Sequence, residues 1–244
     1  MTVATHDIIR KLQQDILPLQ GFKPVTGNSI DINFPLLEHA FPNATFPTGA
    51  VHEFISSTQE GRAATSGFAA ALMGKLMESG GACLWIGSAQ TVFTPALQTF
   101  GAEPHKIIFV NINREKDKLW VMEEALKCER LAAVAGEIRD ISFTDSRRLQ
   151  LAVEKSKVTG FLFRHQPRNL NTIACIARWK ITALASETEA DMPGIGFPAW
   201  QVELLKVRNG KPGVWQIEWT AADGFRSMDK ANVYAPVIQL CQTA

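Results

Sequence analysis

Cysteine and net charge are both scarce in this 244-residue sequence, and each scarcity argues against a class of protein. There are four cysteines, and the net charge is +1 at neutral pH. The cysteines are widely separated and form no Cys-x-x-Cys or Cys/His ligand spacing, so we expect no metal site and free thiols in a reducing compartment. The small net charge argues against the overall basic field that drives tight nonspecific binding to nucleic acid, although it allows a local basic patch.

A signal peptide and a membrane-spanning run are also missing from the pattern. The first twenty residues are amphipathic and carry acids, without the apolar core of a signal peptide. No apolar run is long enough to cross a bilayer. We therefore expect a cytoplasmic protein without membrane contact. With 46% hydrophobic and 20% charged residues, the chain can bury a sizeable core in one generous domain, or in a domain with a small appendage.

Short apolar runs alternate with amphipathic segments through the middle of the chain. Continuous apolar runs of this length are typical of parallel strands buried on both faces. Their alternation with helices predicts a doubly wound α/β core with a mostly parallel central sheet and helices on both faces. The predicted strands are 51–55, 82–86, 106–110, 131–136, a short 141–143 and 160–163, and the predicted helices are 62–78, 95–100, 115–130 and 144–156.

Beyond residue 169 the pattern of predicted elements changes from alternating helices and strands to paired strands. We expect a short helix over 172–177, a strand over 179–184, and an antiparallel hairpin over 200–207 and 214–219, because Asn209-Gly210 favours the positive φ angles of a tight turn. Three parts follow from this organisation. They are a leader (1–45) with an N-terminal helix over about 5–17, a core (46–220) that includes the hairpin, and a tail (221–244).

The segment from Gly49 to Ser79 combines a strand, a small polar connection and an Ala-rich helix. In a nucleotide-binding α/β domain, this connection is the phosphate-binding P-loop, GxxxxGK[ST]. Here the eight residues are SSTQEGRA, in which Ser56 replaces the first glycine, Gly61 keeps the second, Arg62 replaces the lysine and Ala63 replaces the Mg²⁺-binding hydroxyl.

Two interpretations of this connection stay open. Any strand–turn–helix favours a glycine near its turn, which makes the match a structural coincidence. Alternatively, the chain has a P-loop-type fold that has lost ATP chemistry. Arg62 could still hold a phosphate at the helix N-terminus, but Mg²⁺ lacks its protein ligand and Glu60 adds negative charge. We expect weak nucleotide binding at best, with no cofactor and no catalytic residues.

Basic residues are the remaining candidates for partner or DNA contacts. Arg147 and Arg148 lie in the first turn of a predicted helix, where positive charge is unfavourable. They are either neutralised by Asp140 and Asp145 or face an acidic partner. Arg164 and Arg168 bracket a loop at the carboxyl edge of a strand, where such folds bind ligands. Exposed aromatic residues beside them would suit single-stranded DNA, but core packing is the default expectation for the tryptophans Trp179, Trp200, Trp215 and Trp219.

The order of several segments between Phe46 and Trp219 resembles the ImuA family of bacterial RecA-like damage-response proteins. The segments are FPTGAVHE at 46–53, GFAAAL at 67–72, LWI at 84–86, LWVMEEAL at 119–126, DSRRLQLA at 145–152, ARW at 177–179 and WQVELL at 200–205.

The resemblance implies a RecA-like fold without ATPase activity. The positions that match RecA's phosphate-binding lysine, catalytic acid and metal-strand aspartate fall at residue 62 and near residues 89 and 136, and all three are changed. The family implies a role in SOS mutagenesis and translesion synthesis through RecA, an ImuB-type Y-family polymerase homologue and, indirectly, an error-prone C-family polymerase. The runner-up, from the related degenerate fold of SulA, is a cell-division inhibitor that binds FtsZ.

Overall fold

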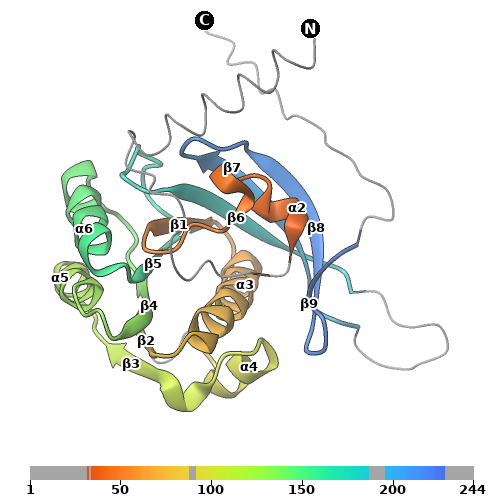
Figure 1. The fold of residues 1–244 in the computed structure, drawn as a ribbon. Helices are drawn as coiled ribbons and strands as arrows, with labels where there is room; N and C mark the ends of the chain where they lie inside the picture. Colours follow the sequence, from red (N-terminus) through yellow and green to blue (C-terminus); the bar gives the residue numbers. More distant parts are fainter. Residues whose placement is uncertain (1–31, 33, 88–91, 187–195, 229–244) are drawn as a thin grey trace, which may run out of the picture.

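A computed structural model describes residues 32, 34–87, 92–186 and 196–228 of the chain. It has a layered α/β architecture in which helices cover both faces of a twisted sheet (Figure 1). The helix expected over residues 5–17 and most of the tail lie outside the described residues.

One sheet of nine strands forms the centre, in the order β3-β2-β4-β5-β1-β6-β7-β8-β9. The first six strands in this order are parallel, and β7, β8 and β9 extend the sheet in antiparallel fashion. This confirms the mostly parallel core and the C-terminal hairpin. The strands are β1 (Val51–Ser56), β2 (Ala82–Gly87), β3 (Ile107–Asn111), β4 (Leu131–Glu137), β5 (Thr159–His165), β6 (Ala177–Leu184), β7 (Ala199–Val207), β8 (Gly213–Thr220) and β9 (Gly224–Ser227).

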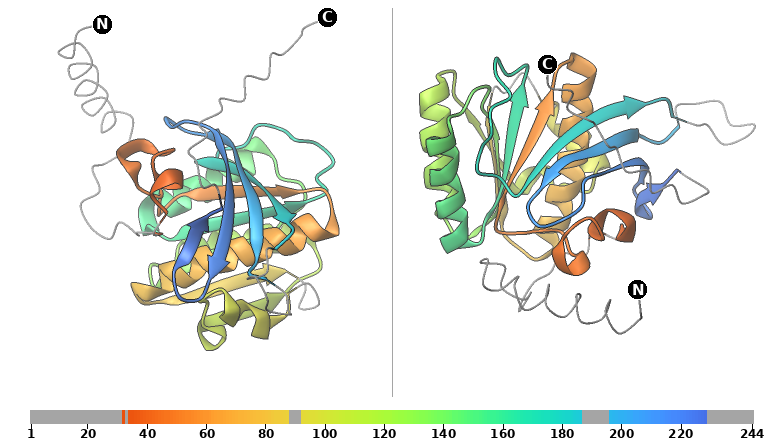
Figure 2. Two further views of the ribbon diagram at one scale, coloured as in Figure 1. Left: turned by 90° about the vertical axis from the view of Figure 1, so that its right-hand side faces the viewer. Right: turned by 90° about the horizontal axis from the view of Figure 1, so that it is seen from above.

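Helices on the two faces of the sheet enclose two separate hydrophobic clusters. The antiparallel half of the sheet curls around α3, while α5 and α6 lie on the opposite face (Figure 2). Within the described part of the chain, no helix has the length and apolarity needed to span a membrane. The helices are α2 (Pro35–Glu38), α3 (Gln59–Glu78), α4 (Thr94–Thr99), α5 (Glu115–Leu126) and α6 (Phe143–Ser156), with 3-10 turns η1 (Pro42–Ala44) and η2 (Pro104–Lys106).

Aromatic side chains fill the space between α3 and the curled sheet. Phe68 of α3 contacts Trp179 of β6, Trp200 of β7 and Phe225 of β9, with ring centroids 5.3–6.2 Å apart. Trp179, Trp200 and Trp219 are buried, as their core assignment predicted. One helix therefore organises both halves of the sheet, because burying large aromatic surfaces is the dominant favourable term in packing.

Two predicted elements are wrong. The expected strand at 141–143 is instead the end of a loop and the first residue of α6, because the Ser142 side chain accepts a hydrogen bond from the Asp145 backbone N–H and caps the helix. The expected helix at 172–177 is a loop that leads into β6. Its residue Ile176 donates its N–H to the Val51 carbonyl, so the backbone is already joining the sheet.

The leader and the hairpin meet at one end of the molecule. Asn209 has the expected positive φ, 57°, whereas the expected positive φ of Gly210 is not present, so the connection is not the predicted two-residue turn. Lys211 of this connection donates its N–H to the Ala40 carbonyl. Phe41 and Phe46 are buried in the same cluster as α3. The sheet continues through β9 to Ser227, beyond the boundary expected at 220, and the three-part division stays a prediction.

The close approach of α3 to the chain after α4 gives a stability prediction. A Cβ atom on Gly74 would lie 2.8 Å from the Gly101 carbonyl carbon and oxygen, and backbone cannot move aside cheaply. Overpacking costs about 1–3 kcal/mol, whereas alanine gains roughly 1 kcal/mol of helix propensity. We expect a net loss of stability for Gly74→Ala, measured as a lower urea midpoint.

The control is Gly61→Ala, in which the nearest contact of the new Cβ atom is the Thr58 hydroxyl at 3.2 Å, so this variant should lose no stability. Equal midpoints for the two variants would contradict the packing argument.

Candidate functional site

The connection that resembles a P-loop is mostly helical in the structure. β1 ends at Ser56 and α3 begins at Gln59, so two residues separate the strand from the helix. Thr58 caps α3 by accepting the N–H of Gly61 at 3.0 Å. The helix therefore begins three residues before its expected start at residue 62, and the second half of the eight-residue connection is the first turn of a capped helix. The N–H groups of Gly61 and Arg62 are bonded to the hydroxyl and the carbonyl of Thr58, so neither is available to a phosphate.

Arg62 is held by a carboxylate of the sheet. Its Nη2 atom donates to Glu137 Oε2 at 2.9 Å, and Trp85 Nε1 donates to Glu137 Oε1 at 3.3 Å. The Glu137 side chain is 8% exposed and that of Arg62 is 24% exposed. Glu137 belongs to β4 itself, one residue beyond the predicted strand end, and Gly87 makes room for it because a Cβ there would lie 2.7 Å from its carboxyl carbon. An incoming phosphate would have to displace this buried carboxylate.

A second contact closes the same edge of the sheet between β1 and β5. Ser56 Oγ and His165 Nδ1 are hydrogen-bonded at 2.6 Å. Burial, and to a lesser extent the nearby Arg62 charge, lowers the pKa of His165 to about 4, so the imidazole is neutral at pH 7. Gln166 has a φ of 46° and donates its N–H to the Ser56 carbonyl at 2.7 Å. The strand ends are thus tied to each other.

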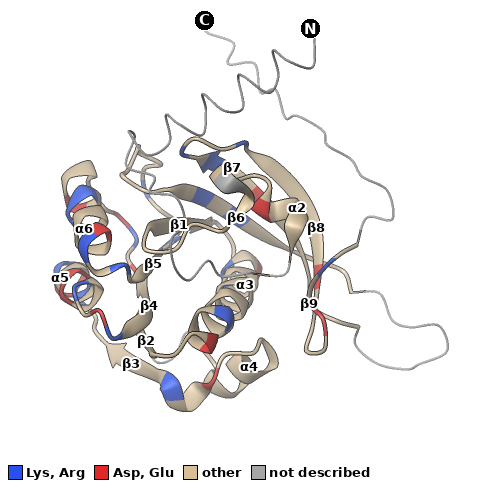
Figure 3. Ribbon diagram, viewed as in Figure 1, with Lys and Arg blue, Asp and Glu red and all other residues tan. Residues whose placement is uncertain are grey.

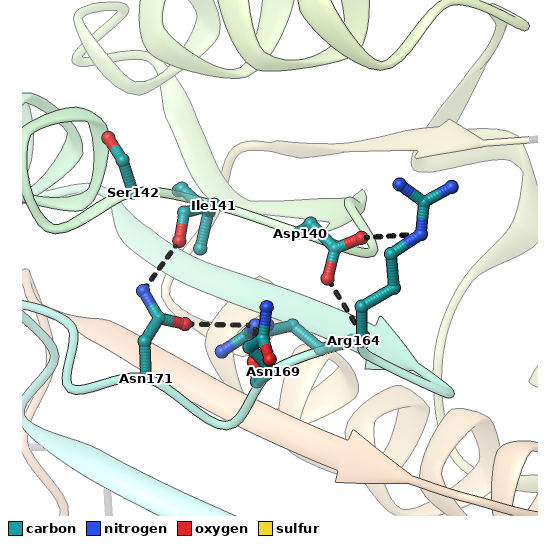
Figure 4. A pocket seen from close by; sticks show the side chains of 7 residues that line it. Asp140, Ile141, Ser142, Arg164, Asn169 and Asn171 are labelled. Carbon is teal, nitrogen blue, oxygen red and sulfur yellow. Dashed lines mark hydrogen bonds and ion pairs between the residues drawn. The ribbon is translucent and has the colours of Figure 1, made fainter.

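A hollow of about 400 Å³ opens beside this closed edge (Figure 4). It lies between the loop after β4 and the loop after β5, with Arg164 at its inner side. Asn171 joins the two loops, because its Nδ2 donates to the Ile141 carbonyl and its Oδ1 accepts from Arg164. The lining residues are Asp140, Ile141, Ser142, Arg164, Arg168, Asn169 and Asn171.

The structure separates the four arginines that the sequence singled out. Arg164 is 0% exposed and donates to the carboxylate of Glu53 at 2.8 Å, so its guanidinium is part of a buried ion pair. Arg168 has a side chain that is 74% exposed. Arg147 and Arg148 lie on the surface of α6 with side chains about half exposed.

Local acids lie beside the two arginines on α6, but of the two acids expected there only Asp145 contacts one of them, since Asp140 pairs with Arg139 and Arg168. Arg148 contacts Glu123 of α5 at 2.6 Å and Asp145 at 3.9 Å, whereas Arg147 contacts Glu154 at 3.7 Å. Residues of both charge signs are mixed along α5 and α6 (Figure 3). This face therefore has no single-sign field of the kind that attracts nucleic acid. Whether any of the four arginines contacts a partner stays a prediction.

Sequence reasoning missed the buried residue that organises the floor of the hollow. Glu53, in the middle of β1, accepts hydrogen bonds from Arg164 of β5 and Arg178 of β6. A signal was present, because a charged residue inside an apolar strand needs a buried partner. The sequence could not say which basic residue supplies it. Among the described residues, no group of three or more His, Cys, Asp or Glu side chains could hold a metal ion.

Comparison with known proteins assigns the chain to a family. No protein-family model matches the sequence. Protein ImuA of Caulobacter vibrioides, in both strain NA1000 / CB15N and strain ATCC 19089 / CIP 103742 / CB 15, is 31% identical over 196 residues, which cover 75% of this chain and 80% of each relative. The crystal structure of SulA from Pseudomonas aeruginosa matches at 18% identity with a TM-score of 0.41, covering 49% of this chain and 99% of that one. Most of this chain aligns with most of Protein ImuA, and it belongs to the ImuA family.

Proposed function

We propose that this chain is a non-catalytic accessory protein of DNA-damage-induced mutagenesis and translesion synthesis. It acts by binding RecA and an ImuB-type polymerase homologue, and reaches an error-prone C-family polymerase indirectly. Membership of the ImuA family supports the process. The residues at the connection that resembles a P-loop support the absence of ATP turnover.

The observation that carries the proposal is the Arg62–Glu137 ion pair. Phosphoryl transfer needs a flexible phosphate-binding loop, a free cation on the phosphates and a metal held by a hydroxyl and an acid. Here the loop is helical, the cation is paired at 2.9 Å, and Ala63 stands at the hydroxyl position. The acid that would serve a metal is the same Glu137 that neutralises Arg62. A RecA-like fold with these substitutions keeps its surfaces and lacks the chemistry, which favours a role in protein–protein binding.

The test uses the purified chain against RecA and the ImuB-type homologue of the same organism, with and without ATP and single-stranded DNA. We expect saturable binding to at least one of the two without added nucleotide, and no ATP hydrolysis. The matched control is Arg62→Ala, which should leave hydrolysis at the same background rate as the parent chain. Turnover that Arg62→Ala abolishes would contradict the proposal. Binding to purified FtsZ, with none to RecA or the ImuB-type homologue, would instead support a role in cell-division control.

A further inference from the structure

The hollow between the loops after β4 and β5 lies over a buried excess of positive charge. Arg164 and Arg178 share the single carboxylate of Glu53, at 2.8 Å and 2.5 Å. Their side chains are 1% and 15% exposed, so water screens them poorly. Their remaining donors reach neutral oxygens, including the carbonyls of Asn169 and Asn171. Two guanidinium groups and one carboxylate leave one positive charge below the floor of the hollow.

Charges at the rim do not cancel this excess. Arg168 Nε lies 3.8 Å from Asp140, and the Arg168 backbone N–H donates to the same carboxylate at 2.9 Å. Arg139 lies 4.0 Å from Asp140 and donates to a backbone carbonyl. The next acid along the chain, Asp145, contacts Arg148 at 3.9 Å. Because two arginines share Asp140, the rim is also positive, and Arg168 extends its guanidinium into solvent.

Two large apolar side chains stand exposed beside this basic hollow. Phe143 is 56% exposed and directly follows the lining residue Ser142. Leu170 is 59% exposed and lies between the lining residues Asn169 and Asn171. Each of these side chains belongs to a direct chain neighbour of a lining residue, so apolar groups stand next to the exposed cation of Arg168. Apolar anchors beside an arginine are typical of a protein interface. A base of single-stranded DNA could stack on Phe143, but Leu170 offers no aromatic face, so the two apolar side chains together suit a protein segment better than nucleic acid.

We propose that this hollow binds an acidic–apolar peptide segment of a protein partner. A carboxylate of the segment pairs with Arg168 over the positive floor, and neighbouring apolar side chains of the segment cover Phe143 and Leu170. Arginine suits this role because its planar guanidinium can bind a carboxylate through two parallel hydrogen bonds. Asp140 accepts the Arg168 backbone N–H and lies 3.8 Å from its Nε, whereas the side chain is 74% exposed and keeps its outer guanidinium donors available to the partner. The inference rests on the proposal that the chain works by binding other proteins.

The experiment uses a phage library of random twelve-residue peptides panned on the immobilised full chain. An enriched peptide is then labelled, and its affinity is measured by fluorescence anisotropy. We expect enriched peptides to carry Asp or Glu next to Leu, Ile or Phe. Arg168→Glu should weaken binding at least about tenfold, since it places like charges together. Phe143→Ser and Leu170→Ser should each weaken it by roughly fivefold as contacts of the apolar rim.

The matched control is Arg226→Glu on β9. Arg226 is also an exposed arginine with one acidic neighbour, Asp223 at 3.5 Å, and it lies at the edge of the sheet away from the hollow. This variant should bind the peptide like the parent chain. Replacing the acid of the peptide with Lys should restore binding to Arg168→Glu. Thermal melts of all variants confirm that they are folded.

Three results of the peptide experiment would overturn the inference. They are a failure to enrich any peptide, enriched peptides without acids, and an Arg168→Glu variant that binds as well as the parent chain. A parallel titration with labelled oligothymidine tests the alternative that the hollow binds nucleic acid. If the parent chain binds this DNA and Arg168→Glu does not, the hollow is a phosphate-binding site. The proposed function is tested separately. If the parent chain and Arg168→Glu bind RecA or the ImuB-type homologue equally well, the proposed function is supported and the proposed docking site is wrong.

Discussion

Replacing Glu53 with Gln should lower the free energy of unfolding by about 3–5 kcal/mol, because it removes the carboxylate that two buried guanidinium groups share. A loss of this size is a large fraction of the 5–15 kcal/mol that typically stabilises a domain. Gln has nearly the shape of Glu, so the change tests charge rather than volume. Urea unfolding at pH 7 measures the effect, and the slope of the transition should stay unchanged.

The matched control for this experiment is Glu203→Gln. Glu203 pairs with Lys180 at 2.9 Å on the same sheet, but Lys180 is half exposed. Exposed ion pairs contribute roughly 0–1 kcal/mol, so this variant should unfold close to the parent chain. If Glu53→Gln lowered the free energy of unfolding no more than Glu203→Gln, water would have to reach Arg164 and Arg178. The buried positive charge below the hollow would then not exist.

Acidification should destabilise the protein between pH 6.5 and pH 4 through His52. Burial lowers the pKa of His52 to about 4, although the hydrogen bond from its Nε2 to the Pro47 carbonyl opposes the shift. The unfolded chain binds a proton near pH 6.5, so it holds more protons than the native state throughout this window. Stability is therefore fully present above pH 6.5 and falls as the pH drops towards 4. From the two pKa values, His52 alone should cost about 2 kcal/mol between pH 7 and pH 5.

The variant His52→Gln tests this dependence, because a Gln side chain can still donate to Pro47 and accept from Trp179. We expect it to be less stable than the parent chain at pH 7, since the ring stacked on Phe46 is lost, and to lose markedly less stability on going to pH 5. His105 is largely exposed, and His105→Gln should keep the slope of the parent chain. Parallel slopes for the His52 variant and the parent chain, in urea midpoints at pH 7, 6 and 5, would refute the assignment.

His165 adds a smaller contribution of the same sign. The pKa of this imidazole is also lowered to about 4, chiefly by burial, but His165 is partly exposed and the Glu137 carboxylate opposes the shift. Its protonation would disturb the hydrogen bond to Ser56 at the closed edge of the sheet. Residual acid sensitivity in the His52 variant is therefore expected.

The sequence by itself determined the class of fold and the family. Apolar runs such as 82–86 and the stripe of α3 carry the local periodicities of strand and helix, and these depend only on side chains close together in the chain. The positive φ of Asn209 is equally local, because Asn adopts the left-handed region more readily than most residues. These features were predictable, as were the tryptophans of the core.

The tertiary structure alone decided what the charged residues do. Glu53 and Arg164 are separated by 111 positions, and Arg62 and Glu137 by 75, so no local pattern could pair them. Their pairing depends on the register of β1 against β5 and on which strands lie next to β4. A one-residue shift in register would turn the Arg164 side chain to the other face of the sheet. For that reason the sequence identified Arg164 and Arg168 together, whereas the fold buried the first as a structural ion pair and left the second exposed at the rim of the hollow.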